Sequence, residues 1–224
     1  TETSSETTSA FYLPRRTTYQ IGTDGNGQGD DVERNVISGN RRDGIYLYGT
    51  GTSQNIVAGN YIGTDPGCST SRGNRSGVLI AGGATDNTIG GTAPLALNVI
   101  SGNLENGLYI TNPGTNANRV TGNYIGTNAA GTAAVGNQGD GVSLSGTGTT
   151  GPGTVIGGTV ARAGNGVTGN GRVGGWGAAV TNARIAGNLI GLNPGGSTGI
   201  GKGLVTALPG VQLENGSAVH TLGG

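Results

Sequence analysis

The chain has 224 residues, of which 50 are glycine and only 11% are charged. Typical soluble domains carry about 25% charged residues and about 7% glycine, so this composition makes a helical bundle or an ordinary α/β core improbable. The 12 basic and 12 acidic residues give no net charge, and no long apolar run is present, so we expect neither nucleic-acid binding nor a membrane span.

The first 20 residues differ in composition from the rest of the chain. They are rich in Ser, Thr and Glu and turn apolar at Phe11, Tyr12 and Leu13. We interpret residues 1–20 as an extended N-terminal arm and residues 21–224 as a folded domain. An arm of this kind can add a strand to a neighbouring subunit. The sequence starts at Thr1 and contains no Met, which favours a processed, secreted product.

A cluster of charged residues follows at positions 30–43. Its acids Asp30, Asp31 and Glu33 are the best candidates in the chain for acid–base catalysis. Arg41 and Arg42 are the matching candidates for substrate clamps or a base. A solvated edge whose charges discourage wrong strand pairing explains the same residues without catalysis. Both interpretations stay open at this point.

The residues just before this cluster have part of the pattern of a calcium-binding loop. Asp24, Asn26 and Asp30 supply oxygen ligands at spacings that resemble the start of an EF-hand-type loop, with Gly29 at its sixth position. The twelfth position is Asn35, so the usual bidentate glutamate is missing. The segment predicts at most a weak Ca²⁺ site, a glycine-rich turn explains it as well, and we expect no other cofactor.

From residue 35 onward the sequence repeats. Residues 35–40 return at 98–103, and residues 59–64 return at 122–127, each 63 positions later. Shorter apolar blocks recur at steps of 20 to 23 residues in the first two thirds of the chain. The blocks begin near Asn35, Asn55, Gly77, Asn98, Asn118 and Gly141, and then less regularly near Asn165, Ala183 and Gly210. One coil for each block predicts a solenoid of about nine coils.

The blocks have the alternation of β-strands. Ile45 and Leu47 fall on one face of a strand, and Tyr46 and Tyr48 fall on the other. Each block can bury its apolar side only by stacking on the next, which predicts parallel sheets. Gly-Asn pairs follow most blocks, as sharp corners require. Corner asparagines that point inward are expected to form amide ladders along the stack.

Three positions bear on covalent modification. Cys68 is the only cysteine, so no disulfide can form within the chain, and it is either a free thiol in a turn or an intermolecular bridge. Asn74 and Asn215 each start an Asn-x-Ser motif, a glycan acceptor pattern short enough to arise by chance.

The recurring blocks Asn-Val-Ile-Ser-Gly-Asn and Gly-Asn-Tyr-Ile-Gly-Thr-Asp resemble those of right-handed parallel β-helix repeat proteins of bacterial extracellular origin, relatives of the pectate-lyase-like superfold. The resemblance covers roughly residues 21 to 217. It implies an all-β fold, a right-handed parallel β-helix. Because the superfold hosts polysaccharide lyases, hydrolases, tailspikes, adhesins and structural proteins, the resemblance does not select one function.

Enzymes of this superfold use acids that converge from neighbouring coils, with Ca²⁺ and a basic residue in the lyases. Aligning the long repeats places Asp43 with Asn106, and Asp65 with Asn128 and Asn193, so each carboxylate is lost one repeat later. No column builds a cluster of acids. A polysaccharide lyase or hydrolase, or a sugar-binding adhesin module, therefore depends on the charges of residues 30–43 and is the second hypothesis.

The two ends lead to the first hypothesis. Strand-like blocks continue almost to the last residue, and we see no amphipathic helix that would cap either end. Uncapped strand edges template further pairing. We therefore expect a non-catalytic extracellular structural protein that self-associates head to tail into a filament or surface layer. The expected subunit interface comprises Phe11, Tyr12, Leu13, Val211, Leu213, Val219 and Leu222.

Overall fold

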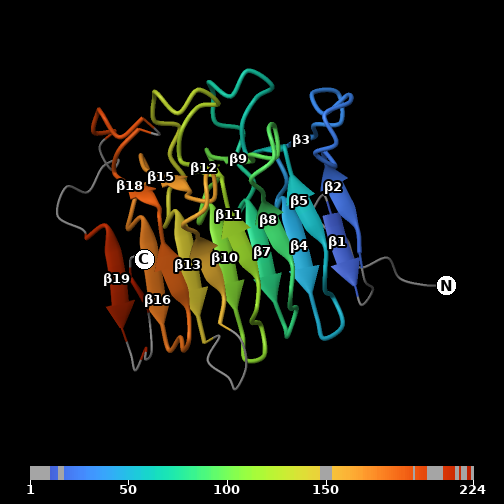
Figure 1. Ribbon diagram of the computed structural model, residues 1–224, viewed down its shortest axis with the longest axis vertical. Coiled ribbons are helices and arrows are strands. Elements are labelled where there is room, and N and C mark those ends of the chain that lie inside the picture. Colours follow the sequence, from blue (N-terminus) through green and yellow to red (C-terminus); the bar gives the residue numbers. More distant parts are fainter. Residues whose placement is uncertain are drawn as a thin grey trace.

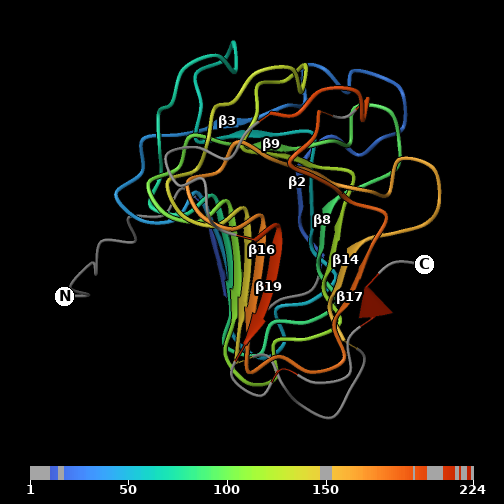
Figure 2. The ribbon, with the colours of Figure 1, turned by 90° about the vertical axis from the view of Figure 1, so that its left-hand side faces the viewer.

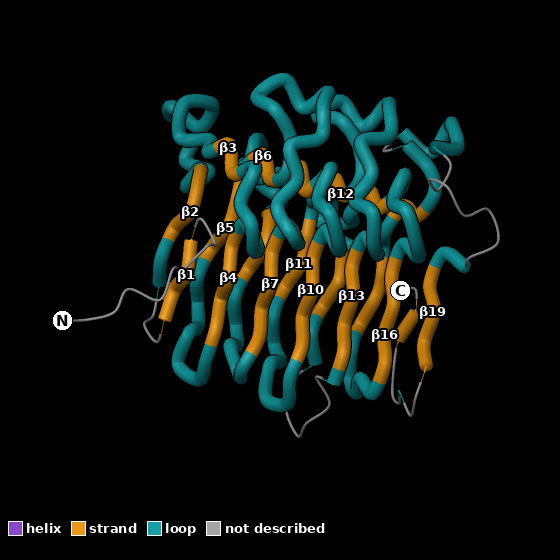
Figure 3. The backbone as a smooth tube through the Cα atoms, turned by 180° about the vertical axis from the view of Figure 1, so that it is seen from behind, coloured by secondary structure: helices purple, strands orange, loops and turns teal. Residues whose placement is uncertain are grey.

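The computed structural model describes residues 11–14, 18–146, 153–193, 195–200, 209–214, 217 and 221–222. Over this part of the chain the fold is an all-β parallel β-solenoid without helices (Figures 1 and 3). The predicted fold class is confirmed. The described residues include no helix long and apolar enough to cross a membrane.

Three parallel sheets form the walls of the solenoid, and the end-on view in Figure 2 shows their three-sided outline. Sheet A contains β1 (Phe11–Pro14), β4 (Ile45–Tyr48), β7 (Val78–Ala81), β10 (Leu108–Thr111), β13 (Val142–Ser145), β16 (Gly175–Ala178) and β19 (Val211–Glu214). Sheet B contains β2 (Gln20–Gly22), β5 (Ile56–Ala58), β8 (Thr88–Gly90), β11 (Arg119–Thr121), β14 (Val155–Gly157), β17 (Arg184–Ala186) and β20 (Thr221–Leu222). Sheet C contains β3 (Val36–Ile37), β6 (Tyr61–Ile62), β9 (Val99–Ile100), β12 (Tyr124–Ile125), β15 (Gly166–Val167) and β18 (Leu189–Ile190).

The expected number of coils is wrong. Ile45 pairs with Val78, Val78 with Leu108, and Leu108 with Val142, so successive coils are 33, 30 and 34 residues long. The stretch from residue 18 to residue 193 therefore makes about 5 turns instead of nine coils. Each apolar block contains one strand, and the nine blocks correspond to every second strand from β3 to β19. Since one coil holds three strands, a single block is less than a coil.

The 63-residue repeat spans two coils because the connections alternate in length. From sheet B to sheet C, the pairs Gly59–Asn60 and Gly122–Asn123 alternate with the long loops 23–35, 91–98 and 158–165, which we call the ridge loops. The connection from sheet C to sheet A alternates in the opposite sense. It is short in the coils that have a ridge loop and long in the coils that lack one. The long loops gather along the sheet C side of the solenoid, at the top of Figure 1.

The core is a column of aliphatic side chains that point inward from all three sheets. The predicted alternation is confirmed in β4, where Ile45 and Leu47 are fully buried and Tyr48 is 41% exposed. The fully buried core side chains include Ile45, Leu47, Val57, Ile62, Val78, Ile80, Ile89, Ile100, Leu108, Ile110, Val120 and Ile125. Stacking of successive coils thus supplies the burial that no single strand could achieve.

Asparagine ladders run along the three corners of the solenoid, as predicted from the Gly-Asn pairs. In most steps, the backbone N–H and the side-chain amide of one Asn both donate to Oδ1 of the Asn in the next coil. The ladders comprise Asn35, Asn60, Asn98, Asn123, Asn165 and Asn188; Asn40, Asn74, Asn103, Asn137 and Asn170; and Asn55, Asn87 and Asn118. The third series gives way to Thr154, whose hydroxyl is buried without a hydrogen-bond partner among the described residues.

Candidate functional site

The first ridge loop is organised around the buried carboxylate of Asp30. Its Oδ1 accepts a hydrogen bond from the Thr23 hydroxyl at 2.7 Å, and its Oδ2 accepts one from the Gly27 N–H at 3.2 Å. At 5% exposure, Asp30 is turned into the loop rather than toward solvent. Both hydrogen bonds hold the loop together, so this predicted catalytic acid has a structural task.

Three acids come together in this loop. Carboxylate oxygens of Asp24, Asp30 and Glu33 lie within 4.8 Å of one another. Glu33 also accepts a hydrogen bond from the Asp24 N–H at 3.0 Å. Two of the three predicted calcium ligands thus belong to the group, together with an acid that we had assigned to catalysis. The third predicted ligand, Asn26, uses its Oδ1 to accept the Gln28 N–H instead.

The basic residues of the charged cluster do not join these acids. Arg41 and Arg42 are exposed on the connection from β3 to β4, and no described acid forms an ion pair with either of them. Asp31 is exposed as well. Arg34 instead lies over the ring of Tyr61, 4.4 Å from its centroid. Among the described residues, the acids of the charged cluster therefore form no ion pair with Arg41 or Arg42.

Two further acids are buried at the corner between sheets C and A. Asp43 accepts bonds from the Arg75 guanidinium, the shortest at 2.9 Å. Burial acts to lower the pKa of Arg75, but the hydrogen bonds and charge of Asp43 outweigh it and raise that pKa. Asp140 Oδ1 accepts the Val173 N–H at 3.3 Å and lies 3.9 Å from the exposed Arg172 guanidinium. Burial outweighs both contacts and raises the pKa of its carboxyl group.

The two buried acids predict opposite effects of amide substitution. Because the pKa of Asp140 is higher in the folded state, its ionised form opposes folding, and stability falls as the pH rises above the unfolded-state value near 3.8. Asp140→Asn should therefore raise stability at pH 7 and flatten this pH dependence. Asp43→Asn should lower stability by about 1 to 2 kcal/mol, because it weakens the bonds to Arg75. Urea denaturation between pH 3 and pH 7 measures both; stabilisation by both variants would contradict the assignment.

Asp65 closes a turn on the loop from β6 to β7. Its Oδ1 accepts the N–H groups of Ser69 and Thr70, at 2.9 and 2.7 Å. The Thr70 bond contributes most to lowering the pKa of this carboxyl group. Asn128 and Asn193 accept the same two backbone bonds in later coils. An amide serves as well as an acid here, so Asp65 shapes the turn and is no catalytic candidate.

The two modification sites that the structure describes, Cys68 and Asn74, are buried. Cys68 is a free cysteine with a fully buried side chain, and the Thr64 hydroxyl donates to its sulfur at 3.4 Å. Burial raises the pKa of this thiol, which disfavours the thiolate needed to form an intermolecular bridge. Asn74 is a fully buried ladder residue whose amide donates to Ile37 O and to Asn103, so it is not accessible as a glycan acceptor. Asn215 lies outside the described residues.

A recess of about 790 Å³ lies on the outer face of sheet C, next to the ridge loops 91–98 and 158–165. We call it the sheet C recess. Its lining combines apolar side chains with polar groups: Leu95, Leu97, Tyr124, Thr159, Val160, Arg162 and Leu189. The sequence interpretation missed it. The feature of the sequence that could have revealed the recess is the segment Gly164-Asn165-Gly166, because the equivalent segments of other coils are Arg34-Asn35-Val36 and Leu97-Asn98-Val99.

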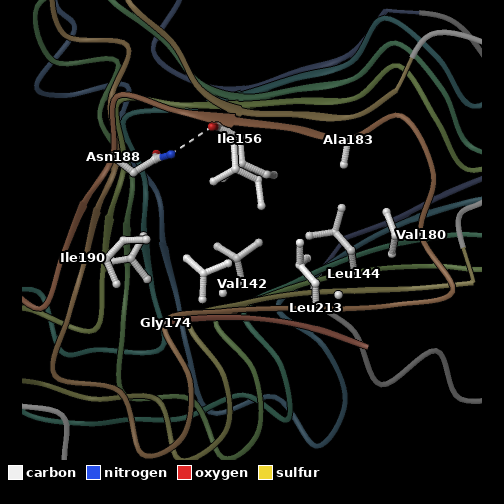
Figure 4. A pocket seen from close by; sticks show the side chains of 14 residues that line it. Val142, Leu144, Ile156, Gly174, Val180, Ala183, Asn188, Ile190 and Leu213 are labelled. Carbon is white, nitrogen blue, oxygen red and sulfur yellow. Dashed lines mark hydrogen bonds between the residues drawn. The ribbon is translucent and has the colours of Figure 1, made fainter. Parts of the chain in front are cut away.

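A second space opens inside the core near the last coils (Figure 4). Gly175 and Gly177 of β16 pair with Val142 and Leu144, and their missing side chains leave an apolar gap of about 20 Å³. The Asn188 amide, which donates to Ile156 O at 2.9 Å, lies at its edge in Figure 4. A gap that holds about one water molecule is a packing defect and not a ligand site.

The predicted interface residues lie at opposite edges of the sheets where the structure describes them. Val211 and Leu213 belong to β19 at one edge of sheet A, and Leu222 belongs to β20 at the same end of sheet B. Phe11, Tyr12 and Leu13 form β1 at the other edge, where their backbone pairs with β4 of the same chain. Val219 lies outside the described residues. Contact with another subunit stays a prediction for all of them.

Comparison with known proteins adds no assignment. No family model, curated protein or solved structure matches the chain. The function therefore has to be inferred from the structure of the chain itself.

Proposed function

We propose that this chain is an extracellular, non-catalytic structural protein that joins other copies of itself end to end, as a filament or surface layer. The recurring blocks support a place among the right-handed parallel β-helix proteins of the pectate-lyase-like superfold. The observation that carries the proposal is the end of the core at β18 and β19, which the described residues leave open. A partner with the same three-sided outline would cover that end.

The open end combines free strand edges with apolar side chains. Within the described residues, β19 pairs only with β16, and β18 pairs only with β15. Ile185, Ile190 and Val211 are half-buried here, and Leu213 is 36% exposed although it points inward from sheet A. Equivalent side chains in the middle coils are fully buried. An unpaired edge beside exposed apolar surface is a template for another parallel coil.

The opposite end supplies a matching surface. Among the described residues, β1 and β2 pair on one side only, with β4 and β5 respectively. Because both sheets are parallel throughout, the edge of β1 has the direction that β19 needs in its next neighbour. Stacking two copies would then continue sheets A and B across the joint. This heterologous contact repeats indefinitely, which is the geometry of a fibre.

The proposal omits catalysis because the buried acids have structural partners. Asp30 and Asp43 hold a loop and an arginine in place, and Asp65 closes a turn. No described basic residue forms an ion pair with Asp24, Asp30 or Glu33.

Sedimentation velocity and negative-stain electron microscopy test the proposal. We expect rods that lengthen with protein concentration. Leu213→Asp should abolish this growth, because it places a charge on the contact face. Leu104→Asp is the matched control, since Leu104 is an exposed leucine on the connection from β9 to β10 and should leave assembly unchanged. Single short particles at all concentrations, or unaltered assembly of Leu213→Asp, would contradict end-to-end joining.

A further inference from the structure

We propose that the sheet C recess binds a small molecule with a planar aromatic ring and a carboxylate. This inference is independent of end-to-end assembly, since the recess lies on the side of the solenoid. It follows from three features of the recess: a gap in a column of side chains, a glycine at the position that covers this column, and an arginine without an acidic partner.

The gap interrupts the outward column of sheet C. The strand register aligns one residue from each coil in this column: Val36, Tyr61, Val99, Tyr124, Gly166 and Leu189. Adjacent strands are about 4.8 Å apart, so Tyr124 and Leu189 are separated by about 9.6 Å with no side chain between them. A flat ring placed over Gly166 would lie about 4.8 Å from each neighbour, a separation at which aromatic rings stack.

The position that covers the column is also a glycine in this coil. In the first coil, Arg34 extends over Tyr61 and donates to Gly59 O at 3.1 Å. The equivalent residue in the coil with the gap is Gly164, where a Cβ would lie 2.0 Å from Gly187 O. Close backbone packing therefore excludes any side chain there. The side chains of Arg34 and Val36, which occupy these two positions in the first coil, are therefore absent here, and Gly164 and Gly166 line the recess instead.

Arg162 supplies the charge of the recess. The loops 91–98 and 158–165 have the same length, and Leu95 and Arg162 occupy the same position with φ of 65° and 64°. Arg162 thus stands where the other loop has a leucine. Among the described residues no carboxylate lies within ion-pair distance of its guanidinium. One unpaired cation beside apolar walls suits a ligand with an apolar body and one negative group.

The size of the recess agrees with a small ligand. Its volume of about 790 Å³ falls in the range of small-molecule sites, which are mostly apolar with a few polar groups. Backbone from several glycines, including Gly91, Gly122 and Gly158, also lines it and lets a ligand approach the main chain closely.

Isothermal titration calorimetry of the full chain with 2-naphthoate tests the inference. We expect saturable binding of naphthoate, and at least tenfold weaker binding of the neutral 2-naphthylmethanol. Equal affinities for the two compounds would overturn the role of Arg162. Absence of saturable naphthoate binding up to millimolar concentration, or tighter binding of glucuronate than of naphthoate, would overturn the aromatic class.

Two variants locate the binding site, and each introduces the residue that another coil has at that position. Gly166→Val matches Val36 and Val99, fills the gap, and should abolish binding. Arg162→Leu matches Leu95 and should reduce naphthoate affinity to that of the alcohol. Arg119→Leu, which removes an exposed arginine on sheet B, is the control and should bind as the wild type does. Circular dichroism confirms folding; wild-type binding by Gly166→Val or Arg162→Leu would overturn the proposal.

Discussion

Replacing Asn98 by leucine is expected to lower the free energy of unfolding by about 3 to 5 kcal/mol, because it interrupts a fully buried ladder. Asn98 Oδ1 accepts the backbone N–H of Asn60 at 2.9 Å and its side-chain amide at 3.1 Å. Its own amide donates to Val57 O at 2.8 Å and to Asn123 Oδ1 at 2.9 Å. Leucine has a similar volume but satisfies none of these groups.

The matched control is Asn35→Leu at the start of the same ladder. Asn35 donates to Asn60 Oδ1 but accepts no bond from a preceding asparagine among the described residues, and it is only half-buried. We expect a loss of about 1 kcal/mol for this variant. Urea denaturation followed by circular dichroism measures both. Equal losses at the two positions would show that burial within the ladder does not set its contribution.

The ladders explain how a chain with so few charges and so much glycine can specify one register. Each amide bonds to its equivalent in the next coil, so a shift of one residue at a corner would leave buried donors without acceptors. The ladders could be predicted from the sequence because Asn recurs at nearly every corner. The alternation within strands could be predicted as well, because Ile and Val mark the inward positions of most strands.

The coil length could not be read from the same pattern. Corners between sheets B and C and corners between sheets A and B both carry Asn, so Asn35 and Asn55 look equivalent although they precede strands of different sheets. The alternation of long and short connections then makes the 63-residue repeat more conspicuous than the single coil. Only the pairing of strands shows that three strands, one from each sheet, share one turn.

The sequence revealed the candidate site whose residues are close together along the chain, but not the one whose residues come from different coils. The acids of the first ridge loop are neighbours in sequence, so local spacing was enough to group Asp24 with Asp30. The sheet C recess depends on Tyr124, Gly166 and Leu189, which come together only through the strand register. In a sequence with 50 glycines, Gly166 cannot be distinguished from a corner glycine until the coil length is known.

Glycine also gives the second large expected effect, a loss of at least about 3 kcal/mol for Gly90→Ala. Gly90 ends β8 with φ of 89°, and a Cβ there would lie 2.0 Å from Thr121 O and 2.5 Å from Asn123 Oδ1. Alanine must therefore adopt a disfavoured backbone conformation and also push apart two coils at a ladder residue. Thr121 O is a backbone atom, and Asn123 Oδ1 is held in place by the two hydrogen bonds that it accepts from Asn98.

Gly175→Ala is the matched control, because it makes the same glycine-to-alanine substitution at a position that has room for a methyl group. Gly175 does not have a positive φ, a Cβ there meets no atom within 4 Å, and the residue borders the apolar gap in the core. Alanine should raise stability by about 0.5 to 1 kcal/mol, because it restricts the unfolded chain and fills part of the gap. Thermal unfolding measures both variants. Destabilisation by Gly175→Ala comparable to that by Gly90→Ala would show that the two glycines are required for the same reason, contrary to the packing described above.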